Sequence, residues 1–179
     1  DAIYLDIDYM DEFMVFTWNS DRFPEPSSMI DELSSMGMKV VAIVDPGVKA
    51  VDGYDVFEDG IKNDSFCKRE DGRLFRAAVW PGESSFPDFL NAATRSWWGE
   101  YYDRLLKNGI AGFWNDMNEP ATGVVPPNAM RFDRDGADHP HERYHNQYAM
   151  LMAMGTREGL KAAMPDLRNP KRFADAVHQ

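Results

Sequence analysis

The segment Trp114-Asn-Asp-Met-Asn-Glu-Pro120 holds the side chains of this sequence that are best suited to chemistry. Two carboxylates, Asp116 and Glu119, stand with two amides and a tryptophan at the end of an apolar run. Retaining hydrolysis of a glycoside needs a carboxylate nucleophile and a second carboxyl as acid/base, about 5–5.5 Å apart, around an oxocarbenium-like centre. Amides and acids also bind sugar hydroxyls, and tryptophan faces stack on sugar rings. The spacing leaves open which carboxylate is the nucleophile, and a polar cap on a strand is the alternative.

Acids also follow two earlier apolar runs. Asp6 and Asp8 come after the first run, and they would point to the same side if a strand continued through them. They would then clamp a ligand hydroxyl, or else cap the following loop. Asp45 opens an Asp-Pro-Gly turn after the second run, and for this residue a turn role is favoured. Trp80, in the next long loop, is either a wall of a sugar pocket or a plug beneath the loop.

Three histidines, His139, His141 and His145, suggest a metal site. His141 to His145 matches the pattern H-E-x-x-H, which in zinc enzymes places two histidines on one helix face beside a glutamate base. The segment is charged, and no further acidic or histidine ligand stands at a plausible place. We therefore expect a solvated helix start and no metal.

Short apolar runs predict the strands that would position these groups, at residues 2–5, 39–44 and 109–114. The runs are nearly continuous, as in parallel strands that are buried on both faces. Helical patterns fill the intervals, at about residues 28–36, 92–108 and 141–163. Ser27 or Ser28 and then Asn91 serve as N-caps, and Gly37 and Gly109 as stops. The order is β-α-β-α-β-α, which favours right-handed crossovers and a parallel sheet.

Long loops occur at only one end of this predicted sheet. The chain leaves its strands through residues 9–26, 45–90 and 115–140, but returns from each helix to the next strand within a few residues. Long loops at the carboxyl ends of parallel strands mark the working face. A closed barrel needs eight strands and typically ~250 residues. The predicted fold class is therefore α/β, a segment of a (β/α)8 TIM barrel with about three βα units.

Composition limits the class of partner. The 179 residues include 30 acidic and 19 basic side chains, for a formal net charge of −11 and no basic stripe. This balance argues against nucleic acid or an anionic membrane as the main partner. No apolar run approaches the length of a membrane span. The chain opens directly into a strand with no signal peptide, so we expect a cytoplasmic location and a cut from a longer protein.

A series of motifs then runs through the chain in a fixed order. They are Tyr4-Leu-Asp-Ile-Asp-Tyr-Met-Asp11, Phe16-Thr-Trp18, Arg22-Phe-Pro24, Lys39-Val-Val-Ala-Ile-Val-Asp-Pro-Gly47, Val79-Trp-Pro-Gly82, Phe86-Pro-Asp88, Trp97-Trp-Gly99 and Trp114-Asn-Asp-Met-Asn-Glu-Pro120. In this order the series resembles glycoside hydrolase family 31, the α-glucosidase group, over about residues 2–160.

This resemblance implies a retaining enzyme that hydrolyses terminal α-linked glucose, a small-molecule carbohydrate, without a cofactor. The predicted strands would be the second to fourth of the barrel. Carried onto matching positions, Asp116 is the nucleophile that forms the glycosyl-enzyme, Glu119 is a supporting residue, and Asp6 binds hydroxyls of the terminal sugar. The walls of the sugar pocket would be Ile7, Ile43, Trp80, Trp114 and Met117.

The sequence also departs from the family pattern. The family's acid/base is an aspartate in a W-x-G-D-N-type segment, which this chain lacks, as it lacks the family's later pocket arginine and histidine. We therefore predict a partial catalytic barrel at 1–163, a tail of unassigned structure at 164–179, and negligible turnover of natural glucosides by this chain alone. Exposed sheet edges predict self-association.

Two other functions remain as alternatives. One is a non-catalytic sugar-binding or scaffold fragment of such an enzyme. The other is a magnesium-dependent, enolase-like barrel enzyme, because three successive strands end in acids. The second would need a base near the mouth, and Lys49 is the only nearby candidate.

Overall fold

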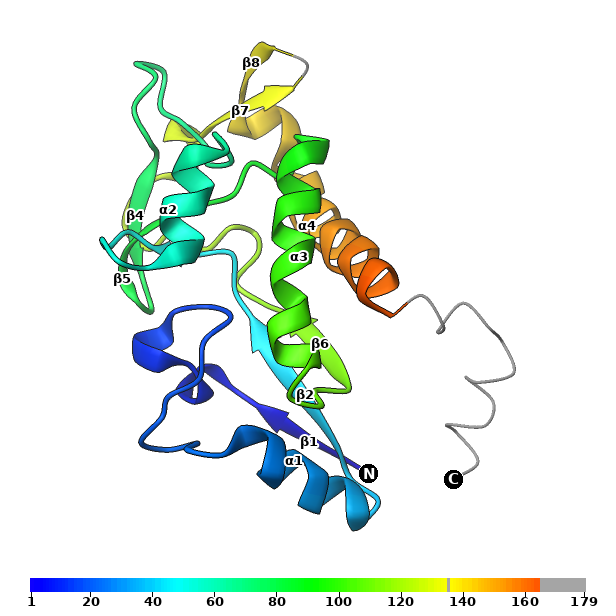
Figure 1. Cartoon of the computed structure of the whole chain (residues 1–179). Coiled ribbons are helices and arrows are strands. Elements are labelled where there is room, and N and C mark those ends of the chain that lie inside the picture. Colours follow the sequence, from blue (N-terminus) through cyan, green and yellow to red (C-terminus); the bar gives the residue numbers. More distant parts are fainter. Residues whose placement is uncertain (135, 165–179) are drawn as a thin grey trace.

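The computed structural model describes residues 1–134 and 136–164, so all of the predicted tail at 164–179 except its first residue lies outside the described residues. The central sheet has three parallel strands in the order β1–β2–β6, and these are Ala2–Leu5, Lys39–Val44 and Gly112–Asn115. Ala2 lies opposite Lys39, and Val41 lies opposite Gly112. The predicted α/β barrel segment with three βα units is confirmed (Figure 1).

Three main helices accompany the sheet: α1 (Pro26–Ser35), α3 (Ala92–Leu106) and α4 (His141–Ala163). Asn91 caps α3 as predicted, because its side chain accepts a hydrogen bond from the Ala93 N–H at 2.9 Å. The predicted serine cap of α1 is wrong. Glu25 is the N-cap residue and Pro26 the first helical residue, a position that suits proline because its missing N–H would be unpaired there anyway.

The two faces of the central sheet differ. Val40, Ala42 and Val44 of β2 are buried on the face that the helices cover, because alternate side chains of a strand share a face. The opposite face carries Tyr4 and Trp114, whose ring centroids are 5.8 Å apart, and 59% of Tyr4 is exposed. In the described part of the chain, β1 and β6 each pair along one edge only. Self-association through these edges stays a prediction.

The loops at the carboxyl ends of the strands contain elements that the sequence did not predict. They are η1 (Ile7–Tyr9), η2 (Asp11–Phe13), β3 (Val48–Lys49), α2 (Asp55–Lys62), β4 (Arg76–Val79), β5 (Gly82–Ser85), η3 (Pro127–Ala129), β7 (Arg131–Arg134) and β8 (Ala137–Pro140). β3, β5 and β4 form a small antiparallel sheet, and β7 pairs with β8 in a hairpin. Phe75 and Phe86 of these loops are almost fully buried and extend the core that lies between the sheet and the helices.

Helices α3 and α4 lie side by side (Figure 1) and hold the end of β6 between them. The Asn115 amide donates to the Thr156 hydroxyl of α4 at 3.0 Å, and its oxygen accepts from the Tyr102 hydroxyl of α3 at 3.1 Å. Tyr102 and Thr156 also bond each other at 2.7 Å. This network fixes the strand that leads into Asp116. Within the described ranges, no helix is long and apolar enough to cross a lipid bilayer.

Candidate active site

Asp116 stands at the carboxyl end of β6 with an exposed side chain. Its backbone N–H donates to the Val44 carbonyl at 3.4 Å, so the pairing of β2 and β6 continues up to this residue. The preceding Asn115 points the other way, into the network with α3 and α4. The expectation that both amides of the segment crowd the mouth is therefore corrected for Asn115, because neighbouring residues of a strand face opposite sides.

The chain turns sharply directly after Asp116. Met117 has a φ of +53°, in the left-handed region that side chains other than glycine seldom adopt. The Ala121 N–H donates to the Met117 carbonyl at 3.0 Å and closes the turn. A strained residue of this kind costs on the order of 1–3 kcal/mol and is most often found at functional sites. The turn keeps Glu119, which is also exposed, at the same end of the sheet.

Asp6 and Asp8 do not share a strand face, because β1 ends at Leu5 and a 3-10 turn begins at Ile7. One oxygen of Asp6 accepts a hydrogen bond from the Ile7 N–H at 2.7 Å and caps this turn. Asp8 instead forms an ion pair with Arg22 at 2.8 Å. Of the two roles considered for this pair, capping therefore applies to Asp6. The Asp6 side chain remains exposed at the carboxyl end of the sheet.

Asp45 is the acid that sequence reasoning undervalued. It is only 8% exposed, and its Oδ1 atom has no hydrogen-bond partner among the described residues. Burial, and after it the charges of Asp116, Asp6 and Glu119, raise the pKa of its carboxyl from 3.8 to about 7. These four carboxyl groups follow β1, β2 and β6 and so lie at the same end of the sheet. The sequence did contain a sign that Asp45 belongs with these acids, because it follows a buried strand in the same way as Asp116. The Asp-Pro-Gly pattern nevertheless favoured a role in a turn.

The predicted pocket walls lie in different settings. Trp80, in the turn between β4 and β5, is 56% exposed, which fits a wall and does not fit a plug beneath the loop. It lines a small hollow together with Met117 and Asp45. Ile43 is almost fully buried, and its carbonyl accepts a hydrogen bond from the Tyr9 hydroxyl at 2.9 Å.

The other two predicted walls, Ile7 and Trp114, are half-buried. Trp114 lies beside Tyr4 on the helix-free face of the sheet, and its indole N–H has no hydrogen-bond partner in the described part of the chain. A buried N–H without a partner is uncommon in proteins and is suited to a ligand oxygen. The part that each wall residue plays in sugar binding stays a prediction.

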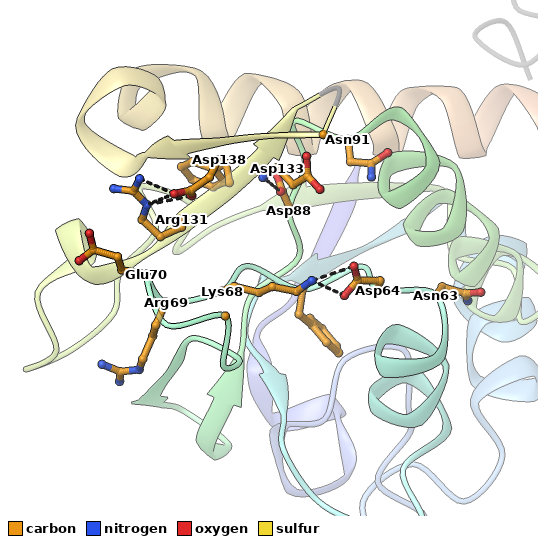
Figure 2. A pocket seen from close by; sticks show the side chains of 14 residues that line it. Asn63, Asp64, Lys68, Arg69, Glu70, Asp88, Asn91, Arg131, Asp133 and Asp138 are labelled. Atoms are coloured by element: carbon orange, nitrogen blue, oxygen red, sulfur yellow. Dashed lines mark hydrogen bonds and ion pairs between the residues drawn. The ribbon is translucent and has the colours of Figure 1, made fainter.

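A separate cavity of about 350 Å³ lies between residues 63–72 and the β7–β8 hairpin (Figure 2). Two of its three cations are paired with acids, since Lys68 pairs with Asp64 and Arg131 pairs with Asp138. Beneath it, the Asp88 carboxylate accepts hydrogen bonds from the N–H groups of Asp133 at 2.5 Å and Leu90 at 3.1 Å. The residues predicted for the active site are not among those that line this cavity.

Asp88 makes the stability of the chain depend on pH. The side chain is 4% exposed, and burial raises the pKa of its carboxyl from an ordinary value of 3.8 to about 7. The folded state then binds this proton more tightly than the unfolded state, so stability falls as pH rises from about 4 to about 7. Asp88→Asn should remove about 3 kcal/mol of this fall between about pH 4.5 and pH 7.5, measured by urea unfolding.

Asp138 offers a matched control for this experiment, because it lines the same cavity but is exposed. A hydrogen bond from Arg131 lowers the pKa of its carboxyl. Its contribution to stability is therefore lost only at more acidic pH, and Asp138→Asn should leave the difference between the two pH values unchanged. A wild-type slope retained in Asp88→Asn would contradict the prediction.

The histidines form a pair and not a cluster of three. Nε2 of His141 lies 2.7 Å from Nδ1 of His145, and the buried His141 ring stacks on Phe132. His139 packs its ring against Tyr144 instead. In residues 1–134 and 136–164, no group of three or more histidine, cysteine or acidic side chains is arranged to hold a metal ion. The zinc interpretation therefore gains no support.

Comparison with known proteins identifies the family of this domain. Residues 1–173 match the model of the glycosyl hydrolases family 31 TIM-barrel domain. The chain therefore belongs to glycoside hydrolase family 31, and the resemblance drawn from the motifs is confirmed.

The relatives in this family include alpha-glucosidases. The chain is 43% identical to "Alpha-glucosidase 2" of Bacillus thermoamyloliquefaciens over 90% of its own length and 21% of that protein. It is 36% identical to "Neutral alpha-glucosidase AB" of Homo sapiens over 98% of its length and 19% of that protein. A crystal structure of the glucosidase II alpha subunit matches 90% of the chain with a TM-score of 0.80 at 34% identity, over 18% of that subunit. The chain thus spans about a fifth of the length of these relatives.

Proposed function

We propose that this chain carries the nucleophile half of the active site of a retaining α-glucosidase that acts on terminal α-linked glucose. The observation that carries the proposal is the position of Asp116. It is an exposed carboxylate at the end of a strand of the parallel sheet, at the same end of the sheet as Asp6, Asp45 and Glu119. Membership of glycoside hydrolase family 31, with relatives named as alpha-glucosidases, supports the substrate class.

In the proposed reaction a carboxylate oxygen of Asp116 attacks the anomeric carbon of the sugar. The bond to the leaving oxygen breaks, the leaving group departs with a proton from a general acid, and a β-glycosyl ester forms on Asp116. Water then cleaves this ester and restores the carboxylate. Asp6 accepts hydrogen bonds from sugar hydroxyls through the oxygen that does not cap its turn, and the exposed indole of Trp80 packs against the ring.

No residue of this chain is assigned as the acid/base, because the sequence has no W-x-G-D-N-type segment. Protonation of the leaving group contributes roughly 10²–10⁴ to the rate of such reactions. The proposal therefore includes negligible turnover of natural glucosides by this chain alone, while the nucleophile remains available for a substrate whose leaving group needs no proton.

The test uses 5-fluoro-α-glucosyl fluoride, whose fluoride departs without acid help. We expect a single glycosyl adduct on intact mass, located by peptide mapping on Asp116. The β-configured fluoride is the control and should give no adduct, because its leaving group shields the face that Asp116 attacks. An adduct on Glu119, or none on a chain that circular dichroism shows to be folded, would overturn the proposal and favour the scaffold alternative.

The magnesium alternative gains no support from the site. Its only candidate base, Lys49, is paired with Glu12. Hydrogen bonding from Lys49 lowers the pKa of the Glu12 carboxyl, as expected for a stable charge pair. Among the described residues, the acids at the strand ends are not arranged as a metal site.

A further inference from the structure

Asp45 differs from the acids around it in its access to water. Asp6, Asp116 and Glu119 are exposed, whereas Asp45 is 8% exposed and its Oδ1 atom lacks a partner among the described residues. The side chain also lines the hollow that Trp80 and Met117 share. It is therefore an unpaired, buried carboxyl group that faces the proposed sugar site.

The groups that act on Asp45 come from two directions. From the chain after β6 come the carboxylates of Asp116 and Glu119, and from the turn after β1 come Asp6 and the hydroxyl of Tyr9. The Tyr9 hydroxyl donates its proton to the Ile43 carbonyl, so it does not offer it to Asp45. Two basic side chains in the loops at this end of the sheet, Arg22 and Lys49, are paired with acids of their own, Asp8 and Glu12.

Carboxyl groups that share one site do not all ionise, because each negative charge disfavours the next. Burial decides which of them keeps its proton, since an anion loses most when it is removed from water. The three exposed acids can be hydrated as anions, and the buried one cannot. Of these four carboxyl groups, Asp45 is therefore the one that we expect to stay protonated.

We propose that Asp45 is a positioning residue that keeps its proton at neutral pH and so allows the ionised carboxylate of Asp116 to lie beside it in position for attack. The role of Asp45 in catalysis rests on the proposed function. Asp45 takes no part in glycosyl transfer. When it releases its proton to solvent at higher pH, the new anion repels Asp116 from the position that the attack requires.

The first test is the pH profile of labelling by 5-fluoro-α-glucosyl fluoride. In the wild type the labelling rate should fall on the order of tenfold above about pH 7, where Asp45 ionises. In Asp45→Asn the side chain cannot ionise, and this fall should disappear. Asp8→Asn is the control, because Asp8 is an exposed acid of the turn after β1 that is paired with Arg22, and its profile should follow the wild type. A wild-type rate that stays level, or an Asp45→Asn profile that still falls, would overturn the inference.

The second test does not depend on labelling or on the folding of Asp45→Asn. Carbon-13 NMR of the carboxyl groups in the wild-type chain should show that Asp45 titrates at about pH 7. In Asp116→Asn this midpoint should move down by about one unit, because one neighbouring charge is gone. A midpoint in the ordinary aspartate range, or one that does not respond to Asp116→Asn, would overturn the inference. Absence of any adduct at every pH would instead contradict the proposed function. This titration would still show whether Asp45 is protonated at neutral pH.

Discussion

Replacing Asp116 with asparagine is expected to abolish labelling by 5-fluoro-α-glucosyl fluoride, with a loss of rate on the order of 10⁴ or more. An amide has no negative charge and attacks an anomeric carbon poorly, so no glycosyl ester forms. The fold should be retained, because the Asp116 side chain is exposed and its only described hydrogen bond uses the backbone N–H. Intact mass after incubation measures the loss of labelling. Urea unfolding below about pH 6, where Asp45 stays mostly protonated in both proteins, measures stability, and the change in unfolding free energy should stay within about 0.5 kcal/mol.

Glu119→Gln is the matched comparison for this experiment. Glu119 is another exposed carboxylate of the same segment, three residues further on, and it also acts on Asp45. As a supporting residue it should slow labelling far less than the change at Asp116. The reverse order, with Asp116→Asn still labelled and Glu119→Gln unlabelled, would make Glu119 the nucleophile.

The central strands and helices could be predicted because their signals are local and long enough. The nearly continuous apolar run at residues 39–44 predicts a buried strand. Asn91 is a preferred N-cap residue and directly precedes a helical pattern. β5 had no such signal. Its four residues, Gly-Glu-Ser-Ser, carry no alternating pattern, and it exists because β3 and β4 pair on either side of it.

The site could be predicted only in part for a related reason. Spacing alone did not separate Asp116 from Glu119, and the choice came from the resemblance to a family. The role of Asn115 depends on helices α3 and α4, which meet it from distant parts of the sequence. The burial of Asp45 likewise depends on tertiary packing, since the hollow that it lines is built from the β4–β5 turn and the chain after β6.

A large effect on stability is also expected from Gly159→Ala, in the contact between α3 and α4. In an exposed helix this change would stabilise by about 1 kcal/mol, because alanine is the better helix former. Here a Cβ at position 159 would lie 2.5 Å from the Cα of Gly99 and closer still to its carbonyl oxygen. Backbone atoms cannot rotate away, so the helices must separate. We expect a net loss of about 2–3 kcal/mol, measured by urea unfolding.

Gly155, one turn earlier on α4, provides the control. A Cβ there would meet Arg95 at 3.3 Å, which a shift of a few tenths of an ångström relieves, so Gly155→Ala should change stability much less. Separation of the helices by Gly159→Ala should also weaken the bonds of Asn115 to Tyr102 and Thr156, which hold the end of β6. Labelling of Asp116 should then slow even in the folded fraction. Unchanged stability together with unchanged labelling would show that α3 and α4 do not position the nucleophile.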